Sequence, residues 1–256
     1  MLTGIDHLVV VVPDLAEAVR HYAGLGFTVV PGGRHPGGSH NALIGLADEA
    51  YIELLAFERP SPGHRWWATF ERTRREGPCL ADFAMATNDL ERDLGVLRAA
   101  GVPMGDPRPG SRARPDGYTV EWRLSTPPTE HTGVAPFLIQ DITPRTERVP
   151  AEQGHHNGVI GIDTLTIAAD DFSWVRRWYD GVLSEAVRRR IAGRVTDASL
   201  LRLGIDRHVL QYQRPESPAD PLNAWLHARG PSPAGATLRT NDGRTHRLSA
   251  AGSLEM

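Results

Sequence analysis

One feature limits the fold of this 256-residue chain more than any other: a strand followed by a capped helix recurs at a fixed register. The first copy is GIDHLVVVVPDL at 4–15, where a run rich in β-branched residues leads into Pro13-Asp14. Such a run predicts a strand, and the aspartate after it predicts a helix N-cap. The same spacing occurs three times: Asp14 follows His7 by seven residues, Asp89 follows Asp82, and Asp171 follows Thr164. Repeats of this length predict a duplicated supersecondary unit whose apolar face is buried against a partner copy.

The first copy predicts a βαβββ unit. Its strands are expected at 4–12, from 27 to 30, at 41–46 and at 51–57, with a helix at 14–25. The glycine-rich segment PGGRHPGGSH at 31–40 is expected to be a mobile or ligand-facing loop, because it lacks the spacing of a phosphate loop. The order recurs with a strand in CLADFAMATNDL, a helix at 90–100, and strands in GYTVEWRLS and APFLIQDI. A third copy begins at 161–172, with a helix at 173–184 and strands near 196–203 and 207–213.

These repeats predict how the chain is divided. Residues 1–142 are expected to form one domain of two βαβββ units. Residues 159–256 are expected to form a partial third and fourth unit, because 159–249 match a shortened copy of roughly 2–142. The segment 143–158 is polar, with two prolines and two glycines, and is expected to be a linker.

Composition excludes several classes of partner. A formal charge of −3 and a pI near 6.4 give no electrostatic footprint for nucleic acid. Cys79 is the single cysteine, so neither an intramolecular disulfide nor a thiolate metal cluster is expected. No signal-peptide pattern and no apolar run of about 18 residues occurs, so we expect a cytoplasmic protein without a membrane partner.

Several stretches together resemble a known family. They are IDHLVVVVPDLAEAVRHYAGLGFTVVPGGRHPGGSHNALIGL, AYIELLA, ATNDLERDLGVLRAAGV, RPDGYTVEW, APFLIQD and HHNG. They resemble the vicinal oxygen chelate superfamily (glyoxalase, bleomycin resistance and dioxygenase proteins) and, within it, the glyoxalase-like domain proteins, over residues 4 to about 185. The resemblance implies an α+β fold in which paired βαβββ units form a curved, mixed, eight-stranded half-barrel. It also implies a site on the concave face, often with a divalent metal, and favours a homodimer.

The resemblance further implies one metal ligand from the first and last strand of each unit. Carried over by position, the ligands are His7, Glu53, Asp82 and Gln140. An imidazole, two carboxylates and an amide oxygen suit Mn²⁺, Fe²⁺, Ni²⁺ or Zn²⁺. Gln140 stands where the resemblance leads us to expect a glutamate, and its neutral amide is a weaker ligand.

Other polar and aromatic residues are candidates for catalysis or substrate binding. Glu53 lies in an apolar run, where an unpaired carboxylate is costly to bury, and His40 can act as a general base near neutral pH. The substrate-binding candidates are Arg34, Asn41, Arg114 and Trp122. His35 and Arg112 are further candidates for holding an anionic group. For each of these residues except Glu53, a solvated or purely structural position is the alternative.

The later copy changes how the opening motif is interpreted. GID occurs at 4–6 and again at 161–163, but Thr164 replaces the histidine. Asp6 is therefore expected to have a structural role, and His7 is expected to take part in the chemistry of the site. Because the equivalent of Glu53 falls near Leu210, residues 159–256 are expected to cover the first domain or to form a dimer interface.

Two functions fit these observations. The first is a metal-dependent enzyme of lyase, isomerase or dioxygenase type, which chelates a small oxygenated metabolite and stabilises an enolate or oxyanion. The second is a metal-free protein that binds a small molecule or sequesters an antibiotic.

Overall fold

A computed structural model of the protein describes residues 2–149, 151, 154–182 and 199–255. The N-terminal strands are β1 (Leu2–Val11), β2 (Val30–Arg34), β3 (Ser39–Gly45), β4 (Tyr51–Phe57), β5 (Cys79–Thr87), β6 (Arg108–Ala113), β7 (Thr119–Ser125) and β8 (Phe137–Asp141). The helices among them are α1 (Leu15–Gly24), α2 (Trp67–Glu76), α3 (Leu90–Ala99), the 3₁₀ turn η1 (Thr129–His131) and α4 (Arg145–Arg148).

The first eight strands form one mixed barrel, in the order β1-β4-β3-β2-β6-β7-β8-β5. In each half, the first strand pairs in parallel with the last: β1 with β4, and β5 with β8. β1 and β5 pair antiparallel and join the halves. The α+β fold of paired βαβββ units is therefore confirmed. The expected half-barrel is closed by a single pairing between β2 and β6, Arg34 with Ala113.

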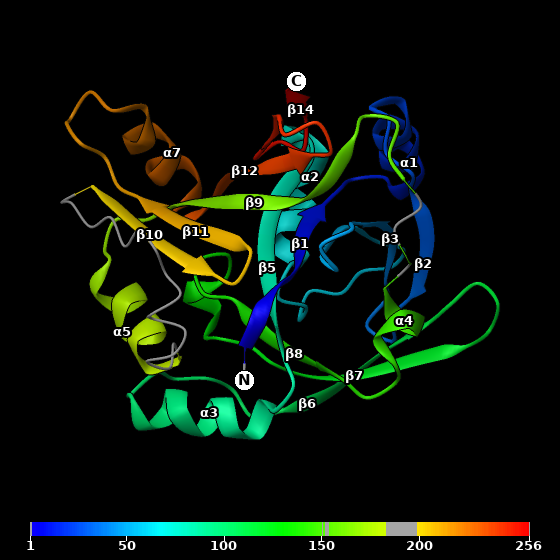
Figure 1. The fold of residues 1–256 in the computed structure, drawn as a ribbon, viewed down its shortest axis with the longest axis horizontal. Coiled ribbons are helices and arrows are strands. Elements are labelled where there is room, and N and C mark those ends of the chain that lie inside the picture. The colour runs from blue at the N-terminus through cyan, green and yellow to red at the C-terminus, as the bar shows by residue number, and fades with distance from the viewer. Residues whose placement is uncertain (1, 150, 152–153, 183–198, 256) are drawn as a thin grey trace.

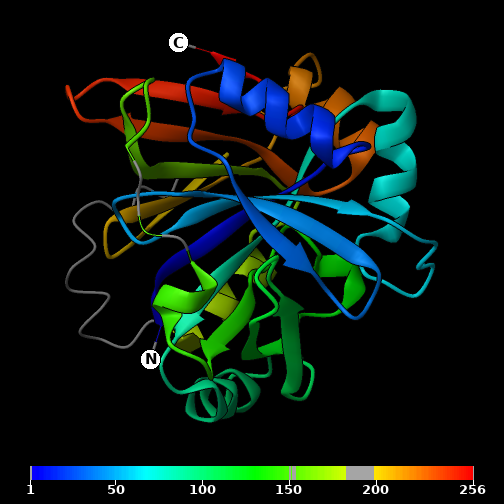
Figure 2. The same cartoon turned by 90° about the vertical axis from the view of Figure 1, so that its right-hand side faces the viewer.

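The local sequence explains both helix starts. The side chain of Asp14 accepts a hydrogen bond from the Glu17 N–H, and that of Asp89 accepts one from the Arg92 N–H. α1 and α2 lie on the outside of the barrel strands (Figure 2). The two caps confirm that α1 and α3 begin at the same position relative to the first strand of their unit.

The segment 31–40 differs from the expected loop. Part of it is β2, which contains Gly32 and Gly33. Gly33 has φ +142°, and a Cβ at this position would collide with the Ala113 carbonyl across the closing pair. Gly33 therefore allows β2 and β6 to approach closely, and it does not mark a mobile loop.

The C-terminal residues form a second sheet with the order β10-β11-β9-β12-β13-β14. Its elements are β9 (Val159–Ala168), α5 (Ser173–Val182), β10 (Leu200–Ile205), β11 (His208–Gln213), α7 (Pro221–Arg229), β12 (Ser232–Thr240), β13 (Thr245–Ser249) and β14 (Leu254–Glu255). β9 pairs in parallel with β11 and antiparallel with β12, as β1 does with β4 and β5. This is the expected shortened copy. Parts of the predicted helix at 173–184 and strand at 196–203 lie outside the described residues.

The two sheets share one core. A continuous apolar cluster includes Leu8 and Phe83 of the barrel and Leu165 and Tyr212 of the second sheet. Figure 1 shows the second sheet, coloured yellow-green to red, beside β1 and β5. The Ile5 N–H donates to His208 Nδ1 at 3.1 Å across this contact. The barrel thus has one wall packed on the second sheet.

Candidate functional site

Asp6 and His7 are both buried, although neighbours on a strand normally face opposite sides. The β1–β5 ladder explains this, because its register shifts between Ile5 and His7 and leaves Asp6 opposite no residue of β5. A bulge of this kind re-aims a side chain. It brings Asp6 Oδ1 to 2.6 Å from His7 Nδ1. The opening motif therefore forms a buried aspartate–histidine pair.

The other ring nitrogen of His7 lies near a second acidic group. His7 Nε2 is 3.6 Å from Glu53 Oε2 on β4. Asn41 Nδ2 on β3 donates to Glu53 Oε1 at 2.5 Å, which fixes that carboxylate. The His7 ring stacks on Tyr51 at 4.5 Å between centroids and meets the edge of Phe137 at 5.3 Å. An imidazole and a carboxylate thus face each other in a rigid setting.

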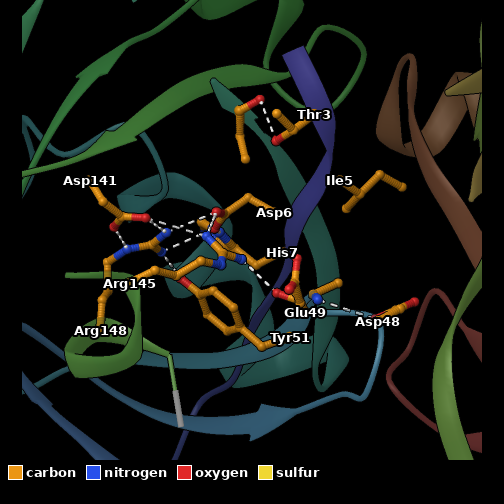
Figure 3. Close-up of polar contacts among 12 residues, drawn as sticks. Thr3, Ile5, Asp6, His7, Asp48, Glu49, Tyr51, Asp141, Arg145 and Arg148 are labelled. Carbon is orange, nitrogen blue, oxygen red and sulfur yellow. Dashed lines mark hydrogen bonds and ion pairs between the residues drawn. The ribbon is translucent and has the colours of Figure 1, made fainter. Parts of the chain in front are cut away.

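Two arginines of α4 hold Asp6 from the other side (Figure 3). Arg148 Nη1 donates to Asp6 Oδ1 at 3.0 Å, and Nη2 donates to Oδ2 at 2.8 Å. Arg145 Nη1 also donates to Oδ2, at 2.5 Å. Arg148 further pairs with Asp141 and reaches the Tyr51 hydroxyl at 2.9 Å. Burial alone would raise the pKa of Asp6, but Arg148, His7 and Arg145 hold it well below its usual value.

α4 lies within 143–158, the segment that the sequence predicts as a linker. In the structure this segment returns to the barrel through Arg145 and Arg148. Arg148 is buried, although arginine is almost never fully buried without a partner. The segment therefore completes the site.

Two further residues, His35 and Arg112, lie near Glu53, and Trp122 contacts His35. Arg112 is the one fully buried residue of β6, and Trp122 is buried on β7. The His35 ring meets Trp122 edge-on at 6.0 Å between centroids, and its Nδ1 lies 3.0 Å from Ser39 Oγ. Burial lowers the pKa of His35; nearby Glu53 opposes this shift and Arg112 adds to it. His35 and Arg112 thus lie within electrostatic reach of Glu53.

Two buried polar atoms in this interior have no hydrogen-bond partner among the described residues: Asn41 Oδ1 and Arg112 Nε. A buried polar group without a partner is costly, and such groups are rare in folded proteins. One is an acceptor and the other is a cationic donor.

The remaining two predicted metal ligands do not join His7 and Glu53. Gln140 Oε1 accepts from the Leu90 N–H at 3.0 Å, at the start of α3. Asp82 is fully buried, and four donors surround its carboxylate: Arg65 Nη2, Trp66 Nε1, and the backbone N–H groups of Phe83 and Gly133. Burial raises the pKa of Asp82, and Arg65 opposes the shift.

The pairing register shows which residue takes the fourth position. Val9 and Ala84 lie five residues before the two helix caps, so they are equivalent. Glu53 pairs with Val9, and Phe137 pairs with Ala84. Phe137 therefore holds the place of Glu53 in the second unit, and it offers no ligand atom.

This donor set does not fit a resident divalent metal. Catalytic zinc sites use three protein ligands at about 2.0–2.3 Å and a fourth position for water. Within the described part of the chain, no cluster of three or more His, Cys, Asp or Glu side chains is placed to hold an ion. Of the four predicted ligands only His7 and Glu53 lie together, because Gln140 accepts from the Leu90 N–H and Asp82 is bound by Arg65.

Three other candidates lie outside the interior. Arg34 and His40 contact Glu58 at the rim of the barrel, with Arg34 Nε at 3.0 Å and His40 Nδ1 at 3.4 Å. The guanidinium of Arg114 pairs with Asp116 and Glu147. Of the predicted site residues, the structure therefore groups His7, Asn41, Glu53 and Trp122, together with the further candidates His35 and Arg112.

The second sheet repeats the arrangement without its chemistry. Thr164 Oγ1 donates to Asp163 Oδ2 at 2.8 Å, in the place of the His7–Asp6 contact. Thr164 pairs with Val209 on β11, so Gln211 takes the position of Glu53. Neither Thr164 nor Gln211 is an acid or a base near neutral pH.

Sequence reasoning missed Arg145, Arg148 and the stacked Tyr51. Nothing local marks the arginines, because they meet Asp6 from 139 and 142 residues away. Alternation along YIELL does place Tyr51 on the same face as Glu53 and was the one signal available.

Within the described residues, no helix combines the length and apolar character that a membrane crossing requires.

Comparisons place the chain among known folds. A family model described as "Glyoxalase-like domain" matches residues 5–183. A hypothetical protein from Staphylococcus aureus has a TM-score of 0.62 and 18% identity, covering 83% of this chain and 86% of that one. A mutant of 4-hydroxymandelate synthase from Streptomyces coelicolor has a TM-score of 0.61 and 15% identity, covering 94% of this chain and 72% of that one. At these identities, the likeness to the two structures shows only that this chain has the same fold. No curated protein sequence matches significantly.

Proposed function

Because this chain belongs to the glyoxalase-like domain family, whose model spans residues 5–183, we propose that it is an enzyme acting on a small oxygenated metabolite. The proposed reaction is of isomerase or epimerase type. A proton is removed from a carbon next to a carbonyl group and is then returned. The observation that carries this proposal is the position of His7 between the carboxylates of Asp6 and Glu53.

The contact with Asp6 assigns the tautomer of His7. When Nδ1–H donates to Asp6 Oδ1, Nε2 keeps its lone pair and faces Glu53. His7 Nε2 is therefore the general base that takes the proton from carbon. The electron pair of the broken C–H bond moves toward the carbonyl oxygen and forms an enolate.

Asp6 supports this step without changing its own protonation. Its negative charge stabilises the imidazolium that forms, and Arg145 and Arg148 keep it ionised. Glu53, held by Asn41, is the second acid–base group and lies on the far side of Nε2. Exchange results when the imidazolium of His7 trades its proton with solvent and then returns a solvent-derived proton to the same carbon.

A protein that binds such a metabolite without turning it over is the second candidate, and it includes an antibiotic-sequestering role. The two unpartnered atoms, Asn41 Oδ1 and Arg112 Nε, favour binding and do not bear on turnover.

Hydrogen–deuterium exchange tests the proposal. Proton NMR in D₂O follows the carbon-bound protons of a panel of carbonyl compounds that includes 2-oxobutyrate and hydroxyacetone. We expect wild type to accelerate exchange, and His7→Gln and Glu53→Gln each to lose about 100-fold or more. His40→Gln at the rim is the matched control and keeps the rate, and circular dichroism checks that each variant is folded. Exchange no faster than in buffer, or exchange that survives in folded His7→Gln, overturns the proposal, and binding without exchange leaves the second candidate.

A further inference from the structure

Arg112 is a buried cation that differs from the other buried arginine of the barrel. Both side chains are almost inaccessible, at 3% exposed for Arg112 and 2% for Arg148. Arg148 pairs with two carboxylates, Asp6 and Asp141. Arg112 has no carboxylate within 4 Å among the described residues, and its one hydrogen bond runs from Nη2 to the Arg148 carbonyl at 2.8 Å. Burying a charge is costly unless it is paired.

The guanidinium is held in place and still has unused donors. Its Nε is buried without a partner. The aliphatic part of the Arg112 side chain packs against the backbone of β2. A Cβ added to Gly33 would lie only 3.1 Å from Arg112 Cγ. A guanidinium carries five N–H donors in a planar fork that suits a carboxylate. Arg112 is therefore preorganised for an anion that the chain itself does not provide.

The surroundings set the charge of that anion. Burial lowers the pKa of Arg112, and Tyr51 and Glu53 are the groups that raise it again. Glu53 is thus close enough to repel an anion bound at Arg112. A single negative charge is balanced by the guanidinium of Arg112, whereas a phosphate carries nearly two. These charges favour a monocarboxylate.

We propose that Arg112 anchors the carboxylate of the substrate, which is therefore a small carboxylic acid with an oxygen on the neighbouring carbon, a 2-oxo or 2-hydroxy acid. This inference rests on the proposed function, because it places the acid in the same interior as His7 and Glu53. The planar fork binds the carboxylate, and the neighbouring oxygen and its carbon extend toward these two residues. Asn41 Oδ1 accepts from a hydroxyl when the ligand has one.

Calorimetric titration of folded protein tests the anchor. The probes are 2-oxo acids of three to six carbons, 2-hydroxybutyrate, the matching neutral amides and inorganic phosphate. We expect wild type to bind at least one acid about tenfold or more tightly than its amide, because a charge-assisted bond to Arg112 is lost in the amide. Arg112→Gln removes this preference, and Arg112→Lys restores part of it. Arg114→Gln removes a solvent-accessible guanidinium from the same segment and leaves the preference unchanged.

The outcomes separate this inference from the proposed function. His7→Gln is expected to keep the preference for the acid while losing exchange. If His7→Gln keeps exchange, the proposed function fails and the anchor is judged by binding alone. The anchor is overturned if no acid binds better than its amide, if phosphate binds better than every acid, or if Arg112→Gln and Arg112→Lys both keep the preference.

Discussion

Asp6 and Arg148 form a buried two-bond ion pair between residues 142 positions apart, with distances of 3.0 and 2.8 Å. The pair joins the first strand of the barrel to α4. It also fixes the carboxylate that contacts His7. The stability of the fold and the geometry of the site therefore depend on one contact.

Replacing Arg148 with methionine is expected to destabilise the protein by about 3–5 kcal/mol, because it leaves the Asp6 charge buried with less compensation. Urea unfolding at pH 7 measures the change. Asp6→Asn with Arg148→Met is expected to cost less than the sum of the single changes, because the double variant leaves no buried charge at this pair. Additive costs would show that the two side chains are not coupled.

Acid is expected to destabilise the protein through His64. Burial lowers the pKa of His64 from 6.5 to about 4. The unfolded chain therefore binds a proton at higher pH than the folded one, and stability falls as the pH drops from 6.5 toward 4. Unfolding free energies at pH 7.5 and 4.5 measure this loss, which His64→Gln should reduce. His156→Gln, at an exposed histidine, is the control. An equal loss in wild type and His64→Gln would exclude this residue as a source.

Gly33→Ala is expected to open the barrel where β2 meets β6. The new methyl group collides with the Ala113 carbonyl, and φ of +142° strains any residue with a side chain. We expect a loss of about 1–3 kcal/mol. Gly63→Ala is the control, since a Cβ there meets no atom within 4 Å. Equal unfolding midpoints for the two variants would show that the closing pair contributes nothing.

Gln140→Ala distinguishes a capping role from a ligand role. It removes the acceptor of the Leu90 N–H, so we expect a loss of about 1 kcal/mol in stability and no change in exchange rate. Thermal unfolding and the deuterium assay are run on the same sample. A folded variant that has lost exchange would mean that Gln140 acts in the site.

The sequence predicts the parts of this site that depend on short-range patterns. Asp14 and Asp89 are predicted as caps, and both caps are confirmed, because an N-cap is formed within a few residues. His7 and Glu53 are found in mid-strand, and strands of one unit bring them together. The sequence predicts Gln140 for the place that Phe137 takes in the structure. Which residue takes this place depends on the register between β5 and β8. Composition does not fix that register.

Local sequence patterns also do not predict the charge balance of the interior. Arg148 is one of many arginines in a chain without lysine, and it lies in a segment with the composition of a linker. Its partner Asp6 is at the other end of the domain. The unpaired state of Arg112 depends on which carboxylates the other arginines take, and only the folded chain determines that.

If the chain's own side chains transfer the proton, the exchange rate does not depend on a bound metal. The rate of deuterium exchange into 2-oxo acids is compared for wild type before and after dialysis against a chelator, with metal content measured on both samples. We expect the same rate in both samples, and loss of the rate in His7→Gln. A rate that disappears with the metal and returns with Mn²⁺, Fe²⁺, Ni²⁺ or Zn²⁺ would contradict this expectation.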